Sequence, residues 1–109
     1  MFKTLYYQVR RKLNITWEDF ETTARVEGII NSAIPILLHK LGISDPDFDF
    51  SAAGAENNLF LAYCLYEWNH CANEFDENYH NDIAQVQDKH RVAKYLEESA
   101  SERDEIQQI

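Results

Sequence analysis

The sequence predicts an all-α fold, a small bundle of three to four helices with a long central loop and a flexible acidic C-terminal tail. The 109 residues include only three Gly and two Pro, too few for the turns of an all-β fold. Hydrophobic residues make up 45% of the chain, which is enough for the core of one domain. Apolar residues also recur at helical spacing in several segments. We therefore expect one helical domain at residues 1–96 and an acidic tail at residues 97–109.

The first predicted helix covers residues 2–13. One of its faces is apolar and the other faces solvent. The apolar face comprises Phe2, Leu5, Tyr6, Val9 and Leu13, and the polar face comprises Lys3, Arg10, Arg11 and Lys12. These cations form a basic cluster in an acidic chain, which makes them a candidate contact surface.

A long second helix is predicted from Thr16 to Leu41. Thr16 is placed as its N-cap, with Asp19 three residues on, and Ile15 is expected to pack against Phe20 as a hydrophobic staple. The inner face of this helix is predicted to carry Phe20, Ala24, Ile30, Ala33, Leu37 and Leu41.

Pro35 interrupts the hydrogen bonding of this second helix, because proline has no backbone N–H. The segment is therefore either one kinked helix or two helices. The apolar spacing continues through the proline, which favours the kink. Gly42 suits the position just after the helix.

Residues 42–56 show no apolar periodicity and are predicted to form the central loop. Phe48 and Phe50 are poor residues for a solvated loop. We expect them to be loop contacts, which either pack onto the core or meet a neighbouring subunit.

Residues 57–75 carry the densest apolar surface of the chain. A helix that is apolar on most sides must be covered on most sides, and a chain of 109 residues has little else to cover it. We therefore expect a second copy of the chain to supply part of the cover. The predicted subunit-interface residues are Phe60, Tyr63, Cys64, Tyr66, Trp68, Phe75 and Tyr79.

The apolar pattern weakens after Phe75 and restarts further on. The restarted stripe comprises Tyr79, Ile83, Val86, His90 and Ala93, with Leu96 close to the same side. This segment is either a fourth helix or a bent continuation of the third. From Glu97 onward the chain is acidic and lacks apolar periodicity, so we predict a frayed tail that folds on binding.

The charge balance narrows the classes of partner. Ten Lys and Arg against nineteen Asp and Glu give a net charge of −9, which argues against a protein that grips phosphate backbones. Solubility alone explains such a balance, and so does a basic partner or a need to repel passing DNA. No apolar signal segment follows Met1 and no stretch is long enough to span a membrane, so we expect no membrane association and a cytoplasmic site of synthesis.

Candidate chemistry is sparse. Glu67 with His70, and Glu77 with His80, repeat the Glu-x-x-His pattern of helical di-iron proteins, but they lie too close in sequence to face each other across a bundle. Cys64 and Cys71 stand two helical turns apart, too far for a disulfide within one helix, and are interpreted as reduced core residues. We expect no enzyme activity, no metal and no cofactor.

Three sequence features together resemble one known family. Leu13-Asn14-Ile15 leads into the long helix, Leu41-Gly42 ends it, and a Phe-x-x-Asn-Tyr-x-x-Asp-Ile segment follows the aromatic helix at Phe75, Asn78, Tyr79, Asp82 and Ile83. In these features the chain is similar to the head–tail connector proteins, or head-completion adaptors, of tailed bacteriophages. The resemblance covers roughly residues 5–96.

The resemblance implies a structural virion protein. Copies would form a ring beneath the portal, at the head–tail interface, and would extend the channel through which DNA leaves without binding it specifically. The implied partners are further copies of the chain, the portal protein and the next head-completion or tail protein, with assembly in the host cytoplasm. The C-terminal segment would dock on the portal through Glu97, Glu98, Glu102, Ile106 and Ile109.

Two other functions are open at this point. An acidic module could imitate DNA and inhibit a DNA-binding protein, which requires carboxylates at phosphate-like spacing along one exposed face. A metal-dependent enzyme could use the Glu-x-x-His pairs, which requires those side chains to converge.

Overall fold

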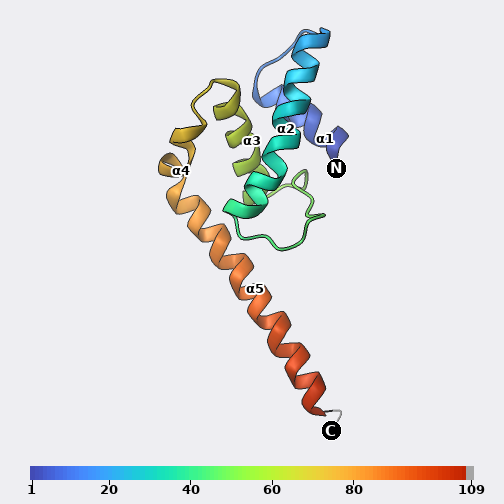
Figure 1. Cartoon of the computed structure of the whole chain (residues 1–109), viewed down its shortest axis with the longest axis vertical. Coiled ribbons are helices and arrows are strands. Elements are labelled where there is room, and N and C mark those ends of the chain that lie inside the picture. Colours follow the sequence, from blue (N-terminus) through green and yellow to red (C-terminus); the bar gives the residue numbers. More distant parts are fainter. Residues whose placement is uncertain (108–109) are drawn as a thin grey trace.

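A computed structural model describes the backbone of residues 1–107 and the side chains of residues 1–100. Within residues 1–107 the secondary structure is entirely helical, which confirms the all-α class. Helices α1 to α4 and the start of α5 form a bundle, and the remainder of α5 projects from it (Figure 1). The helices are α1 (Phe2–Lys12), α2 (Phe20–Lys40), α3 (Ala55–Trp68), the 3₁₀ turn η1 (Ala72–Glu74), α4 (Phe75–Asn78) and α5 (His80–Gln107).

Helix α1 closely follows the prediction. Its Leu5 and Val9 are fully buried. Asn14 ends the helix with a positive φ of 58°, and the next amide, that of Ile15, donates to the carbonyl of Arg10 at 3.0 Å. This is the Schellman pattern, which satisfies carbonyls that the helix end would leave unpaired.

Helix α2 begins later than predicted, because Asp19 and not Thr16 is its N-cap. The Asp19 carboxylate accepts from the amide of Thr22 at 2.7 Å and from its hydroxyl at 2.9 Å. An N-cap side chain accepts from the amide two or three residues further on, so Asp19 and not Thr16 is in position to bond Thr22 and fixes the start. The predicted staple is also wrong, because Ile15 is buried whereas Phe20 is 88% exposed.

The two-helix alternative for this segment is wrong. Helix α2 continues through Pro35, whose own position is exposed to solvent. Of the predicted inner face, Phe20 and Ala24 are exposed, so their placement was wrong, but the remainder is buried together with Val26. That buried remainder is Ile30, Ala33, Leu37 and Leu41.

The loop that joins α2 to α3 contributes to the core. Gly42 begins it with a φ of 67°, in a second Schellman ending. Phe50 is fully buried, with its ring centroid 4.9 Å from that of Phe60. Phe48 is half-buried and packs edge-on against Phe50 at 5.1 Å. Both phenylalanines therefore pack onto their own core.

Helix α3 ends at Trp68, earlier than the predicted segment. His70 takes a positive φ of 59°, and the amide of Cys71 donates to the carbonyl of Tyr66 at 2.9 Å, again in a Schellman ending. Helix α3 packs against α1, α2 and α5, so its second layer comes from the same chain. Turn η1 and the short α4 then reverse the direction of the chain (Figure 1).

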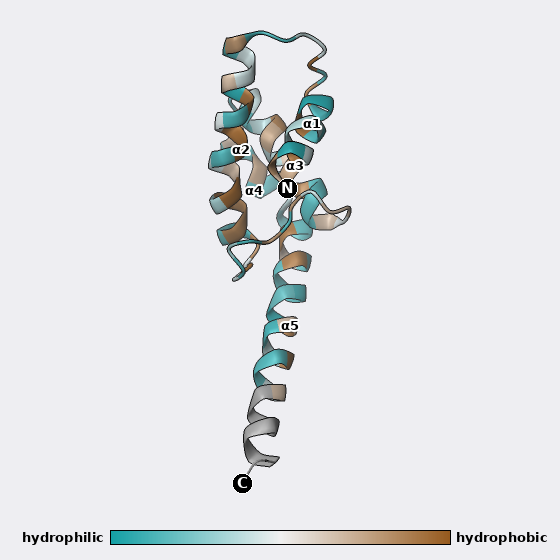
Figure 2. Cartoon of the chain, turned by 90° about the vertical axis from the view of Figure 1, so that its right-hand side faces the viewer, coloured by the Kyte–Doolittle hydropathy of each residue, from teal (hydrophilic) through white to brown (hydrophobic). Residues whose placement is uncertain are grey.

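Helix α5 is a separate helix and not a bent continuation of α3. Its 28 residues correspond to a rod of about 42 Å, which explains the long dimension of a 62 × 28 × 19 Å molecule. The expected frayed tail is instead helical as far as Gln107, because residues 97–107 contain neither Gly nor Pro and are rich in Glu, Ala, Arg and Gln. Figure 2 shows the projecting part of α5 as mainly hydrophilic, with separate hydrophobic positions.

Candidate functional site

The described side chains offer little for catalysis. Burial raises the pKa of the Cys64 thiol to about 12, so this residue is a neutral core side chain and not a nucleophile. Glu67 accepts a hydrogen bond from Tyr63 at 3.0 Å, and the ring of His70 lies beside Arg25. Among the side chains of residues 1–100, no three His, Cys, Asp or Glu residues converge to hold a metal ion.

The predicted interface residues of the aromatic segment lie mostly inside the protomer. Four of the seven, Phe60, Tyr63, Cys64 and Phe75, are at most 4% exposed. The remaining three, Tyr66, Trp68 and Tyr79, are half-buried against the core. This conformation therefore leaves only the last three with surface for a partner.

An aromatic cluster joins α3 to α4. Phe75 lies at its centre, with ring centroids of Tyr63, Tyr66 and Tyr79 at 5.2, 5.8 and 5.0 Å. Burial raises the pKa of Tyr63 to about 12, and the hydrogen bond to the Glu67 carboxylate acts in the same direction. The cluster fixes the chain reversal that directs α5 back along the bundle.

Trp68 is held by Arg25 of helix α2. The Arg25 guanidinium lies 4.0 Å from the centroid of the indole ring and donates to the Trp68 carbonyl at 2.6 Å. A cation over a tryptophan face is a favourable contact. Contacts with Arg25 and the core thus cover part of the surface of Trp68 within its own protomer.

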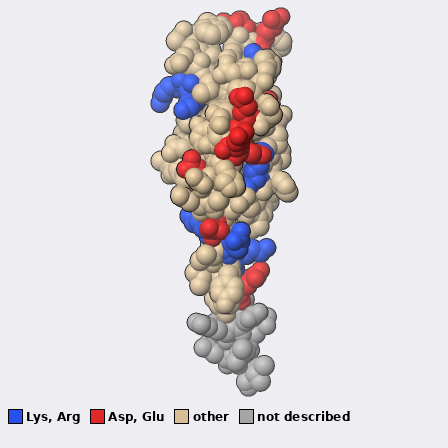
Figure 3. Space-filling view, turned by 90° about the vertical axis from the view of Figure 1, so that its left-hand side faces the viewer, with Lys and Arg blue, Asp and Glu red and all other residues tan. Residues whose placement is uncertain are grey.

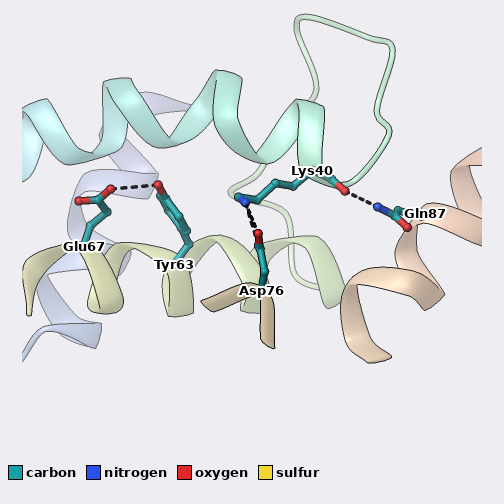
Figure 4. A network of polar contacts seen from close by, with 5 residues as sticks. All are labelled: Lys40, Tyr63, Glu67, Asp76 and Gln87. Atoms are coloured by element: carbon teal, nitrogen blue, oxygen red, sulfur yellow. Dashed lines mark hydrogen bonds and ion pairs between the residues drawn. The ribbon is translucent and has the colours of Figure 1, made fainter. Parts of the chain in front are cut away.

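Polar bonds fix where α5 leaves the bundle, and Figure 4 shows them from close by. Lys40, the last residue of α2, donates to both carboxylate oxygens of Asp76 at 2.8 Å. Gln87 of α5 donates to the carbonyl of Lys40 at 2.7 Å. The end of α2 is therefore bonded to both α4 and α5.

A buried carboxylate makes a further attachment between α3 and α5. Glu56 is 8% exposed and pairs with Lys89, and its Oε1 lies 3.1 Å from His90 Nε2. Burial raises the pKa of Glu56, but the hydrogen bonds from Lys89, the backbone and His90 together outweigh burial and hold the pKa below its usual value. The ring of His90 also packs edge-on against Phe48 at 5.7 Å.

Beyond these attachments α5 projects as a rod, and we call residues 91–107 the stalk. Its first turns expose three large apolar side chains, Val92, Tyr95 and Leu96, which are 56%, 67% and 61% exposed. Their spacing places them on one face of the helix, and we call this face the stalk stripe. The sequence interpretation missed it, because Leu96 was assigned to the inner stripe of Ile83 and Val86.

A groove of about 550 Å³ lies between α3, the first half of α5 and the end of α1. Its apolar floor comprises buried Leu59, Ala62 and Val86 with half-buried Leu61 and Tyr79. Its exposed rim comprises Lys12, Lys89, Asp82, Ala55, Asn58 and Gln85. Of the predicted interface residues, only Tyr79 lines this groove.

The predicted portal-docking residues are all in or beyond the stalk. Glu97 and Glu98 are exposed on α5. Glu102 and Ile106 belong to the same helix, but their side chains lie outside the described residues, as does the whole of Ile109.

Comparison with known proteins gives no match: no family model, no curated protein and no solved structure is significantly similar to this chain. None of the helices within residues 1–107 combines the length and the apolarity needed to cross a bilayer.

Proposed function

We propose that this chain is a structural subunit that assembles with copies of itself, and that it forms the ring-shaped head–tail connector of a tailed bacteriophage. The observation that carries the proposal is the stalk: a helix that leaves the bundle with Val92, Tyr95 and Leu96 more than half exposed. Large apolar side chains in one exposed patch are typical of surfaces that another molecule covers.

The viral setting comes from the sequence resemblance described above. In that setting the ring lies beneath the portal, the stalk reaches the portal, and the net charge of −9 keeps DNA from adhering to the channel. A ring also requires two different surfaces on each subunit, one for each neighbour. The bundle and the stalk are the two surfaces that we propose for these contacts.

The alternative of an acidic module that imitates DNA gains no support from the face in Figure 3. There the Asp and Glu side chains form separate groups, the largest a short patch at mid-height, with Lys and Arg side chains beside and between them, and no acidic row extends along the whole face. The metal-enzyme alternative requires a convergent ligand set, and the side chains of residues 1–100 contain none.

The test is the mass of the protein in solution, measured by light scattering over a range of concentrations, alone and with a portal protein. A ring predicts a species many times heavier than the 12.8 kDa chain. The double variant Tyr95→Ser/Leu96→Ser is expected to lose this species. The matched control Tyr7→Ser, at a 53% exposed tyrosine on α1, is expected to keep it. A protein that stays monomeric under all these conditions would refute the proposal.

A further inference from the structure

We propose that Glu56, Lys89 and His90 form an acid-sensitive latch between α3 and α5. The latch holds the stalk in one direction at neutral pH, and protonation of Glu56 releases the stalk while α1, α2 and α3 stay folded. The inference goes beyond the proposed function, because it concerns a single protomer and holds whether or not copies assemble.

The latch is the last attachment of α5 to the bundle. Lys89 and His90 both bond to Glu56 at the start of α3, and the other side-chain bond from α5 to the bundle comes from Gln87, just before them. Among the described side chains, residues 91–100 form no hydrogen bond or ion pair with the bundle, and the stalk projects from it (Figure 1). The direction of the stalk therefore depends on the latch.

The carboxylate of the latch is enclosed and faces the two ionisable side chains of α5. His90 Nε2 lies 3.1 Å from Glu56 Oε1, and Lys89 pairs with the same oxygen. The backbone of Gly54 lies near the other oxygen, since a side-chain carbon at Gly54 would be 3.5 Å from Oε2. Phe48 packs edge-on against the ring of His90 at 5.7 Å, which shields the pair further.

The other elements around Glu56 give its carboxylate no partner. In the loop before α3, the carboxylates of Asp45 and Asp49 accept bonds from backbone amides of their own turns. On α1, Lys12 lines the neighbouring groove together with Lys89 but does not pair with Glu56. No charged side chain of α2 bonds with it either. Within residues 1–100 the charge of Glu56 is thus balanced from α5 alone.

Protonation of Glu56 removes the only anion of the latch. The bonds from Lys89, the backbone and His90 hold the pKa of Glu56 below its usual value, so the attachment is intact at neutral pH and is lost as the pH falls through that lowered pKa. In acid the imidazole of His90 is a cation as well, and it then lies beside Lys89 with no carboxylate between them. Because charges enclosed without a partner are costly, both cations move towards water and the stalk leaves with them.

The three helices beneath the latch do not titrate in the same way. Among the side chains of residues 1–100, Glu56 is the only buried one that carries a charge. Helices α1, α2 and α3 pack through fully buried apolar side chains, among them Val9, Ile30 and Phe60, whose burial does not depend on protons. Acid therefore acts on the attachment of α5 before it acts on the core.

The experiment is pulsed electron paramagnetic resonance on the full chain with two spin labels. One label is at Ala100→Cys on the stalk and the other at Glu27→Cys on α2, both exposed positions, in a chain that also carries Cys71→Ser. Cys64 is fully buried and stays unlabelled. An excess of unlabelled chain ensures that every distance is measured within one molecule. We expect one narrow distance at pH 7 and, at about pH 3, a ratio of attached to released molecules that is lower by at least about tenfold.

Two pairs of variants make the test specific. Glu56→Gln keeps the shape but removes the charge, so it is expected to lose the narrow distance already at pH 7, whereas Glu77→Gln, at an exposed glutamate of α4, should keep it. Lys89→Gln removes one of the groups that lower the pKa of Glu56, so its stalk should be released at a higher pH than that of the wild type. Lys94→Gln, at an exposed lysine of α5 that does not bond with Glu56, should leave the pH of release unchanged.

A second label pair, Lys3→Cys with Glu27→Cys, follows the bundle and should give a narrow distance at both pH values. If this pair broadens together with the stalk pair, the whole domain unfolds in acid and the latch is overturned. A stalk pair that stays narrow in acid, or a Glu56→Gln chain with the wild-type distance at pH 7, overturns it as well. None of these results depends on the mass of the assembly, so the latch and the proposed ring stand or fall separately.

Discussion

Asn57 is the residue whose loss should show most directly how the loop is attached to the helices. The residue is 8% exposed, and its side-chain amide donates two hydrogen bonds, to the carbonyl of Phe50 at 2.8 Å and to Gln8 Oε1 at 2.9 Å. Gln8 in turn donates to the carbonyl of Ser51 at 3.0 Å. One side chain therefore connects α1, the loop and α3.

Asn57→Ala removes both bonds and leaves the buried carbonyl of Phe50 without its donor. Each lost bond is worth about 1 kcal/mol, and an unsatisfied buried acceptor adds a further 1 kcal/mol or more, so we expect a loss of about 3 kcal/mol in the free energy of unfolding. For a domain of this size that corresponds to a fall in Tm of about 12 °C. Urea denaturation at pH 7 measures the first quantity and calorimetry the second.

Two further variants make the test specific. Asn58→Ala, at the exposed neighbour on the same helix, should change stability by less than about 0.5 kcal/mol. Asn57→Asp keeps the shape but places a carboxylate against the Phe50 carbonyl, which should raise the pKa of the new acid. Its deficit relative to wild type should therefore shrink as the pH falls towards 4. If Asn57→Ala behaves like Asn58→Ala, or if the Asn57→Asp deficit grows in acid, the bonding described here is wrong.

Three other predictions concern single sites. The pKa of Glu56 is lowered on folding, so its contribution is present above the unfolded pKa and lost in acid; Glu56→Gln should cost about 1–2 kcal/mol in urea at pH 7 and almost nothing near pH 3. Asp19→Ala removes the N-cap bonds to Thr22 and should cost about 1 kcal/mol by the same assay, whereas a neutral result would mean that α2 starts elsewhere. Cys64, with a pKa of about 12, should react with a thiol reagent at pH 8 only after unfolding, while the half-buried Cys71 reacts first, and equal rates would contradict the described burial.

The sequence was sufficient for the bundle because its helices follow simple rules. The boundaries of α1 and the buried positions Ile30, Ala33 and Leu37 agree with the apolar spacing. Phe50 was recognised as a residue that a solvated loop does not need, and it is fully buried. In each case the local apolar spacing and the need to bury large apolar side chains predict the same position for the residue.

Two helix boundaries were predicted wrongly, and each has its own cause. At the start of α2 two residues suit the N-cap position, and at the end of α3 neither Gly nor Pro marks the last turn. Thr16 and Asp19 both suit an N-cap, and only the two bonds from Thr22 decide between them. The end of α3 carries neither Gly nor Pro, and His70 instead takes the left-handed conformation, which costs a residue other than glycine about 1 kcal/mol. A residue-by-residue propensity does not reveal such an ending. The Schellman bonds around it stabilise the reversal that the aromatic cluster then fixes.

The aromatic segment shows why apolar density does not by itself locate an interface. Helix α3 has the densest apolar surface, but α1, α2, α5 and the loop cover it, so the side chains predicted to join subunits mostly hold the protomer together. The stalk has few apolar residues, yet Val92, Tyr95 and Leu96 stay exposed because α5 extends past the bundle. A change at Phe60 should therefore unfold the subunit, whereas a change at Tyr95 should leave it folded and alter association alone. The proposed contacts between copies therefore belong to the part of α5 that extends beyond the core, and not to the segment where apolar residues are densest.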